Sequence, residues 1–253
     1  MRMCAGVVFS VLAVTALPAA AEPPAGLALF EVSQVNRDAV PAGTPEAFFA
    51  AFGKPQNAFG ASRWYQTTRE VNGQAVTFVP LTLIPLPGGR VALVSTGASD
   101  CDGHACSGVN AVHYLQRDTR AGRYTAVGEW LDVGASGTFG NPASRWGWSS
   151  AIAEAPVLYT EGGGVWQGYA CSHASLTELT PAGPVEIASI PISYSDEGAV
   201  DTGSTRLEGR ITAAEQGRNF TVTYTGSRAF TERYVRGADG RYQVVGKSEV
   251  PGC

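Results

Sequence analysis

The pattern of hydrophobic and polar residues predicts one early helix. Residues 44–46 (Thr-Pro-Glu) are typical of a helix start, because a hydroxyl cap, a proline in the first turn and an acidic side chain all suit that position. Phe48, Phe49 and Phe52 then fall on one face at helical spacing, and Gly53 ends the pattern. We expect these phenylalanines to pack on a sheet.

The chain after this helix alternates between β-rich runs and turns. The first predicted strands are 75–86, 90–96, 110–116 and 123–130. Pro80 and Pro85 are expected to interrupt the first of these strands, because proline cannot donate a ladder hydrogen bond. The last two strands are expected to form a hairpin around Ala121-Gly122.

A stretch rich in glycine, serine and asparagine, 133–148, divides the pattern, and we take its start near Gly134 as a domain boundary or a long functional loop. The predicted fold class is mainly β (α+β). An antiparallel sheet with an N-terminal helix occupies 22–133, and a second antiparallel β-rich unit occupies 134–253.

The sequence also contains an internal similarity. Residues 91–97 are similar to 220–226, and a hairpin follows each. A duplicated or repeated meander and a chance similarity between hairpins both explain this.

Composition narrows the class of protein. Of the 253 residues, 44% are hydrophobic, which is enough for a packed core and excludes wholesale disorder. There are 18 Lys and Arg residues against 22 Asp and Glu residues, so the basic footprint of a nucleic-acid-binding protein is missing.

The first 21 residues are typical of an export signal. A positive start, an apolar run at 5–17 and small residues at 19–21 fit this interpretation, and a core helix is the alternative. No later apolar run is long enough to span a membrane, so we expect a soluble periplasmic or secreted protein. Removal of Arg2 leaves 17 basic against 22 acidic residues, a net charge of −5.

Four cysteines remain after the signal, an even number that suits an oxidising compartment. They allow three pairings. Cys101 and Cys106 are close enough to close a small loop, which leaves Cys171 to hold the last residue, Cys253. Metal binding by the first pair with His104 is the alternative, and an exported thiol pair is more often a disulfide. We therefore expect no metal and no cofactor.

The segment between these first two cysteines is the most informative part of the chain. Its residues are Cys101, Asp102, Gly103, His104, Ala105 and Cys106. A disulfide across them would make a rigid recognition loop between two strands, which loses little entropy when it binds a partner. The alternative is a stapled turn whose histidine points to solvent.

The layout of strand, Cys-x-x-His-x-Cys, strand, turn and strand resembles the Ivy-type periplasmic inhibitors of c-type lysozyme, over residues 45–130. The resemblance implies a Cys101–Cys106 disulfide and a His104 that enters the lysozyme cleft and contacts both catalytic carboxyl groups. The usual Lys-Pro before the histidine is Asp102-Gly103 here, and the following acid is Ala105. Asp102 brings negative charge toward an acidic cleft, which should weaken binding.

Other chemistry has weaker support. Trp146, Trp148, Trp166 and Tyr169 lie near glycines and would form a glycan-binding surface if exposed, whereas a β core is the alternative. His173 would support a hydrolase only if it lay beside an acid in a cleft. The start of a calcium loop at Asp100 lacks the required glutamate, since Ala111 stands there.

The sequence therefore predicts a non-catalytic protein that inhibits lysozyme or a related basic muramidase through the His104 loop. A module that binds peptidoglycan or another glycan through the aromatic residues is the alternative. A hydrolase is the third hypothesis.

Overall fold

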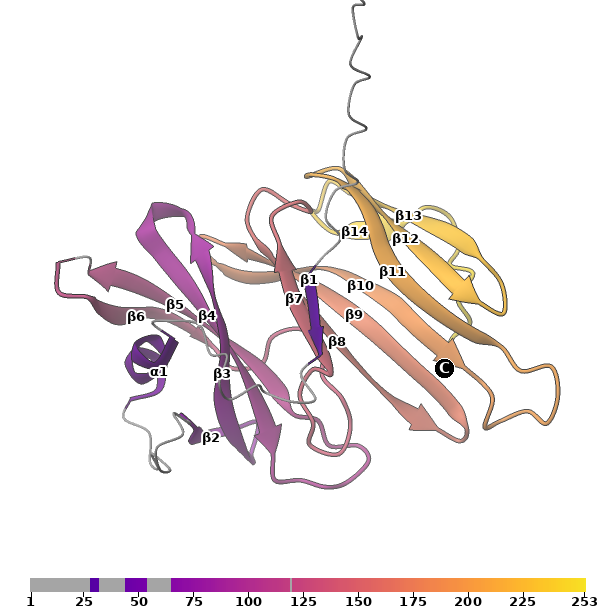
Figure 1. Ribbon diagram of the computed structural model, residues 1–253, viewed down its shortest axis with the longest axis horizontal. Coiled ribbons are helices and arrows are strands. Elements are labelled where there is room, and N and C mark those ends of the chain that lie inside the picture. Colours follow the sequence, from indigo (N-terminus) through magenta and orange to yellow (C-terminus); the bar gives the residue numbers. More distant parts are fainter. Residues whose placement is uncertain (1–27, 32–43, 54–64, 119) are drawn as a thin grey trace, which may run out of the picture.

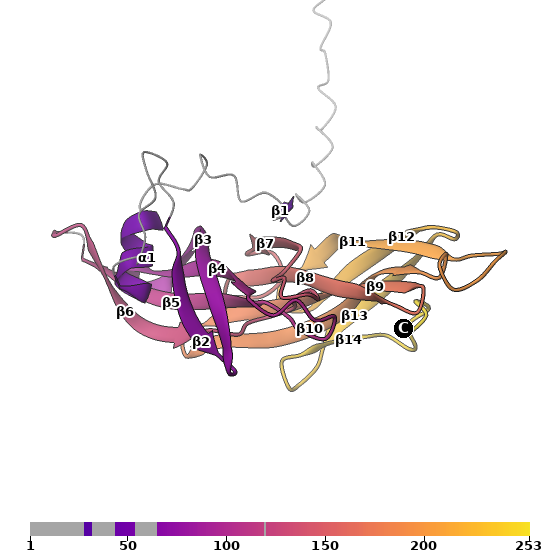
Figure 2. The same ribbon diagram turned by 90° about the horizontal axis from the view of Figure 1, so that it is seen from below.

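The structure is a computed structural model that describes residues 28–31, 44–53, 65–118 and 120–253, and the predicted export signal lies outside them. It contains two antiparallel sheets and one helix, which confirms the predicted fold class (Figure 1). The helix and the five-stranded sheet lie at one end of the molecule, and the last strands of the nine-stranded sheet lie at the other (Figure 2). None of the helices described is long and apolar enough to cross a membrane.

The elements in chain order are β1 (Ala28–Glu31), α1 (Thr44–Phe52), β2 (Thr67–Val71), β3 (Gln74–Leu86), a 3-10 turn (Pro87–Gly89), β4 (Arg90–Ser99), β5 (Val109–Asp118), β6 (Arg123–Trp130), β7 (Arg145–Ser149), β8 (Val157–Trp166), β9 (Tyr169–Thr180), β10 (Gly183–Ser195), β11 (Arg206–Glu215), β12 (Asn219–Gly226), β13 (Phe230–Arg236) and β14 (Tyr242–Val244). One sheet has the order β2-β3-β4-β5-β6, and the other has the order β1-β7-β8-β9-β10-β11-β12-β13-β14. The short N-terminal strand β1 therefore joins the sheet that the C-terminal half builds.

Helix α1 has the predicted boundaries and packs on the five-stranded sheet. Phe48 and Phe52 are buried, and the Phe52 ring stacks on that of Phe78 with 5.2 Å between centroids. The guanidinium of Arg69 donates to the backbone carbonyl of Phe52 at 2.8 Å, which satisfies one of the unpaired carbonyls at the helix C-terminus. The predicted packing on a sheet is confirmed for Phe48 and Phe52, whereas Phe49 is half-buried and contacts Tyr65 before β2.

The expectation that Pro80 and Pro85 interrupt the first strand is wrong, because β3 runs unbroken through both. Strand β2 pairs with β3 only as far as Phe78, so β3 has a neighbouring strand on one side only beyond that point. A bulge between Pro80 and Thr82 shifts the register of the pairing between β3 and β4. Proline is tolerated at such positions because, on an edge, a backbone N–H that faces away from the neighbouring strand makes no hydrogen bond in the sheet.

The two sheets share a hydrophobic core. Ile84, Val94 and Tyr114 of the five-stranded sheet pack with Leu158 and Leu179 of the nine-stranded sheet. The two copies of the internal similarity lie in different sheets, and each is part of three consecutive antiparallel strands that end at a sheet edge. The shared core places the loop after β4 close to the strands of the other sheet.

His113 is fully buried on β5, between helix α1 and the sheet. Its Nε2 atom lies 2.9 Å from a carboxylate oxygen of Glu129, and its ring contacts Phe52 edge-on. Burial lowers the pKa of His113 below its ordinary value of 6.5, and Glu129 opposes this shift only in part. This packing indicates a structural role for His113.

This burial predicts a pH-dependent stability. Below about pH 6.5 the unfolded chain binds a proton at His113 that the folded protein does not, so the free energy of unfolding should fall as the pH falls, by at most about 1.4 kcal/mol per pH unit. Urea unfolding between pH 5 and 8 measures this slope. We expect His113→Gln, which retains a hydrogen bond to Glu129, to flatten it, and an unchanged slope would assign the pH dependence to other groups.

Candidate functional site

The predicted disulfide between Cys101 and Cys106 is present and closes the loop between β4 and β5. Within it, the backbone N–H of Cys106 donates to the carbonyl of Gly103 at 2.9 Å, so the loop is a tight turn. Asp102, Gly103 and Ala105 are exposed, whereas His104 is half-buried.

His104 does not stand free of the molecule. Its Nε2 atom lies 2.7 Å from the backbone carbonyl of Val165, which is in β8 of the other sheet. A carbonyl only accepts, so Nε2 carries the proton and Nδ1 is the remaining nitrogen. The ring also makes edge contacts with Phe139 and Trp166, at centroid distances of 5.0 and 5.4 Å. The histidine therefore joins the disulfide loop to the tip of the β8–β9 hairpin.

Phe139 is the site residue that the sequence analysis missed. Its side chain is 53% exposed although its ring contacts His104, and its backbone φ of 54° lies in the left-handed region. A bulky residue in that region is strained by about 1–3 kcal/mol and persists only where its surroundings hold it. The neighbouring Gly140 is held at Cys106 and Ser99 by backbone hydrogen bonds of 3.2 and 2.9 Å. Its strained backbone and its exposure make Phe139 a candidate functional residue.

Trp166 ends β8 and is 44% exposed. Its indole ring lies over Gly164, where an added Cβ would come within 2.8 Å of the ring and 2.7 Å of Thr138. The following turn, Gln167-Gly168, has positive φ at both residues, and the Gly168 carbonyl accepts a 3.2 Å hydrogen bond from Gly198. Gly164 therefore leaves the space that the indole occupies, and a backbone hydrogen bond fixes the turn that follows Trp166.

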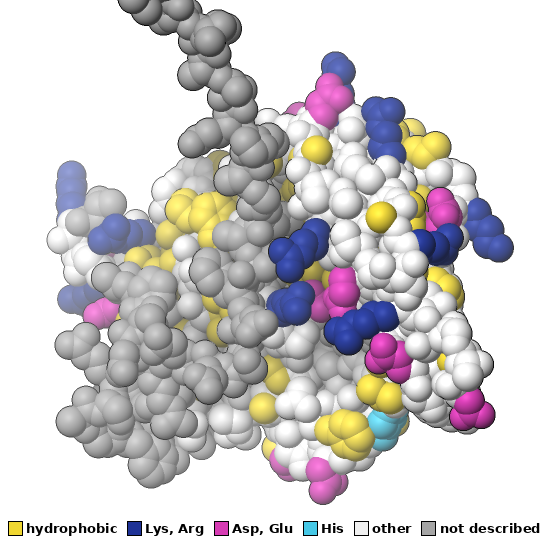
Figure 3. Space-filling view, turned by 45° about the vertical axis from the view of Figure 1, so that its right-hand side comes forward, with side chains coloured by type: hydrophobic (Ala, Val, Ile, Leu, Met, Phe, Trp, Pro, Cys, Tyr) yellow, Lys and Arg dark blue, Asp and Glu magenta, His cyan; other side chains and the backbone are white. Residues whose placement is uncertain are grey.

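A pocket of about 600 Å³ is lined in part by Thr138 and Val165, which directly precede Phe139 and Trp166 in the chain. Its lining comes from three parts of the nine-stranded sheet and its loops: Gly137, Thr138, Asn141, Pro142, Ala143 and Ser144 before β7, Gly163, Gly164 and Val165 of β8, and Ala170, Cys171, Ser172 and Ser193 of β9 and β10. The polar side chains in it are small hydroxyls and one amide, which suit hydrogen bonds to a polar uncharged ligand. In the space-filling view of Figure 3, an exposed histidine, in cyan, lies beside hydrophobic side chains, in yellow.

A carboxylate lies behind the pocket wall. Glu161 is 6% exposed, and it accepts a 2.9 Å hydrogen bond from the hydroxyl of Tyr159 and a longer one, 3.4 Å, from Ser172. Arg145 lies 3.7 Å from the same carboxylate. Burial, together with the negative charge of Glu161, raises the pKa of Tyr159 well above its usual range, so Tyr159 keeps its proton.

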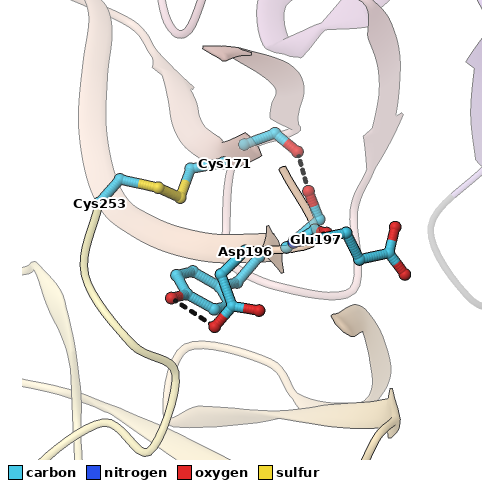
Figure 4. The surroundings of a disulfide bond; sticks show 8 residues. Cys171, Asp196, Glu197 and Cys253 are labelled. Atoms are coloured by element: carbon cyan, nitrogen blue, oxygen red, sulfur yellow. Dashed lines mark hydrogen bonds between the residues drawn. A yellow bond between two sulfur atoms is a disulfide. The ribbon is translucent and has the colours of Figure 1, made fainter. Parts of the chain in front are cut away.

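The second predicted disulfide, between Cys171 and Cys253, is also present and holds the last residue of the chain against β9 (Figure 4). Asp196 and Glu197 lie close to it, where β10 ends. Two disulfides indicate an oxidising, extracytoplasmic environment.

The four aromatic residues of the predicted glycan surface separate into two pairs. Trp146 and Trp148 lie on β7, and Trp148 packs against the core that the two sheets share. Trp166 and Tyr169 face each other across the turn of the β8–β9 hairpin, and both are partly exposed. The exposed pair lies beside the His104 loop.

The other hypotheses from the sequence concern His173 and metal binding. His173 is exposed on β9, opposite Gly162 and Pro191, and makes no hydrogen bond or ion pair with an acid among the residues that the structure describes. In the same residues no three metal-binding side chains come together, and both cysteines of the His104 loop are oxidised.

Comparisons with protein-family models, curated proteins and solved structures found no match to this chain. The resemblance to the lysozyme inhibitors therefore rests on the Cys-x-x-His-x-Cys motif and the residues around it.

Proposed function

We propose that this is an exported carbohydrate-binding protein, periplasmic or secreted, whose site consists of Trp166, Phe139, His104 and the adjoining pocket. The observation that carries the proposal is the cluster of three rings, two of them about half exposed, next to a pocket whose lining includes Thr138 and Val165, the residues just before Phe139 and Trp166. Aromatic faces pack on the apolar faces of sugar rings, while hydroxyl and amide groups bind the sugar hydroxyls.

The rigidity of the site supports this proposal. A disulfide holds the His104 loop, backbone hydrogen bonds hold Phe139, and Gly164 leaves room for Trp166. Groups that are already ordered lose less entropy when a ligand binds. The strain at Phe139 is also more readily explained by a binding role than by packing, because half of its side chain faces solvent.

Binding to a panel of glycans tests the proposal. The probes are insoluble peptidoglycan, soluble neutral oligosaccharides, amino-sugar oligosaccharides and uronic acid oligosaccharides, measured by pull-down and by titration against residues 22–253. We expect binding to at least one class, and Phe139→Ala should weaken it. Val185, 50% exposed on β10, provides a control substitution, Val185→Ala, away from the site. A protein that binds no member of the panel would refute the proposal.

Lysozyme inhibition is the second candidate. The disulfide-closed loop presents Asp102, Gly103 and Ala105 to solvent, and a partner of charge −5 would be steered toward a basic muramidase. To contact two carboxyl groups with both ring nitrogens, His104 must first release the carbonyl of Val165.

A cell-wall lysis assay with c-, g- and i-type lysozymes distinguishes this candidate. If the loop inhibits, the wild type slows lysis and His104→Ala does not, while Trp166→Ala, which leaves the loop intact, still inhibits. No inhibition of any of the three enzyme types would exclude this second candidate.

A further inference from the structure

A line of hydrogen bonds leads from the buried carboxylate of Glu161 to the wall of the pocket. Ser172 lies 3.4 Å from a carboxylate oxygen of Glu161, and the Ser172 and Ser193 hydroxyl oxygens are 2.6 Å apart. Both serines line the pocket, whereas Glu161 is almost fully buried behind them.

Either serine could donate across the 2.6 Å contact taken alone, but the two contacts can both be hydrogen bonds in one direction only. An ionised carboxylate only accepts hydrogen bonds, so Ser172 donates its single hydroxyl proton to Glu161. Ser172 can then take part in the 2.6 Å contact only as an acceptor, so Ser193 donates to it. The Ser193 oxygen has no second proton, and toward the pocket it offers lone pairs alone.

We propose that this site selects ligands that place an O–H or N–H donor at Ser193, which are neutral and amino sugars. Sugars whose group at that point is a carboxylate, sulfate or phosphate are disfavoured, because two acceptors would face each other there. The inference rests on the proposed carbohydrate site and names its ligand class.

The charged groups near the pocket also favour neutral and amino sugars over acidic sugars. Glu161 carries a buried negative charge, and Arg145 lies 3.7 Å from that carboxylate. Asp196 and Glu197 lie by the disulfide of Cys171, which lines the pocket (Figure 4). These carboxylates do not line the pocket, but their negative charge would repel an anionic sugar and attract a sugar ammonium group.

Titration of the wild type with neutral, amino and uronic acid oligosaccharides of equal length tests the selectivity. We expect the neutral and amino oligosaccharides to bind about tenfold more tightly than the uronic acids, the size of effect that a mismatched hydrogen bond produces. Ser193→Ala should weaken binding of the neutral sugar roughly three- to tenfold. Ser189→Ala, at an exposed position of the same strand, is the matched control.

Ser172→Ala tests the direction of the line itself. Without Ser172 as acceptor, the Ser193 proton is free to point into the pocket, so the preference for neutral over acidic sugars should shrink to less than about threefold. The melting temperature of each variant shows whether it folds, and Ser193→Ala provides the test if Ser172→Ala does not fold.

The outcomes separate this inference from the proposed function. A wild type that prefers acidic sugars, or a folded Ser172→Ala variant with unchanged preference, overturns the inference and leaves carbohydrate binding intact. A wild type that binds no sugar overturns both. A preference for neutral and amino sugars that Ser172→Ala removes supports both.

Discussion

The Trp166→Ala variant should lose at least about tenfold in affinity for the glycan that the wild type binds, with little change in melting temperature. The indole is 44% exposed and lies beside the pocket, so its removal deletes binding surface rather than core. Central aromatic side chains of binding sites commonly contribute more than about 1.4 kcal/mol, which corresponds to tenfold in affinity. Titration calorimetry of both proteins measures the loss.

Two further variants serve as controls for the Trp166→Ala result. Trp166→Tyr keeps an aromatic face and should retain much of the affinity, whereas Val185→Ala removes an exposed apolar side chain elsewhere and should retain all of it. Full affinity in a folded Trp166→Ala variant would show that the sugar binds elsewhere.

The Cys171–Cys253 disulfide should contribute more to stability, and the Cys101–Cys106 disulfide more to binding. The Cys171–Cys253 bond closes a loop across 82 positions, and the Cys101–Cys106 bond closes one across 5. From loop closure we expect replacement by serine to lower the free energy of unfolding by about 4 kcal/mol for the first bond and about 2 kcal/mol for the second. Replacing the Cys101–Cys106 pair should nevertheless weaken glycan binding more, because that bond orders the His104 loop.

Each double-serine variant serves as the control for the other. Denaturant unfolding gives the stability and glycan titration gives the affinity of both. If the Cys101–Cys106 variant bound glycan as tightly as the wild type, the His104 loop would have no part in the site.

Local patterns were sufficient to predict much of the fold. The cap at 44–46 and the three phenylalanines defined α1, because helix ends and amphipathic faces depend on residues a few positions apart. The hairpin around Ala121-Gly122 was predicted for the same reason. The two prolines in β3 misled the sequence analysis, because their tolerance depends on which strand lies beside them, and that is a property of the whole sheet.

The site was predictable only in pieces. Spacing pointed to Cys101, His104 and Cys106, and the clustering of aromatic residues near glycines pointed to Trp166. Their contact joins residues 61 and more positions apart in two different sheets, and no local pattern encodes it. Phe139 could not be found at all, since its importance lies in its backbone conformation and its exposure rather than in its neighbours in sequence.

The measurement that tests the account most directly is nuclear magnetic resonance mapping of isotope-labelled protein titrated with a neutral oligosaccharide. We predict that the largest shifts fall on the indole N–H of Trp166 and on the backbone amides of His104, Phe139 and Ser193. Shifts centred on Trp146 and Trp148, or an unchanged spectrum at saturating sugar, would contradict a carbohydrate site at the rim of this pocket.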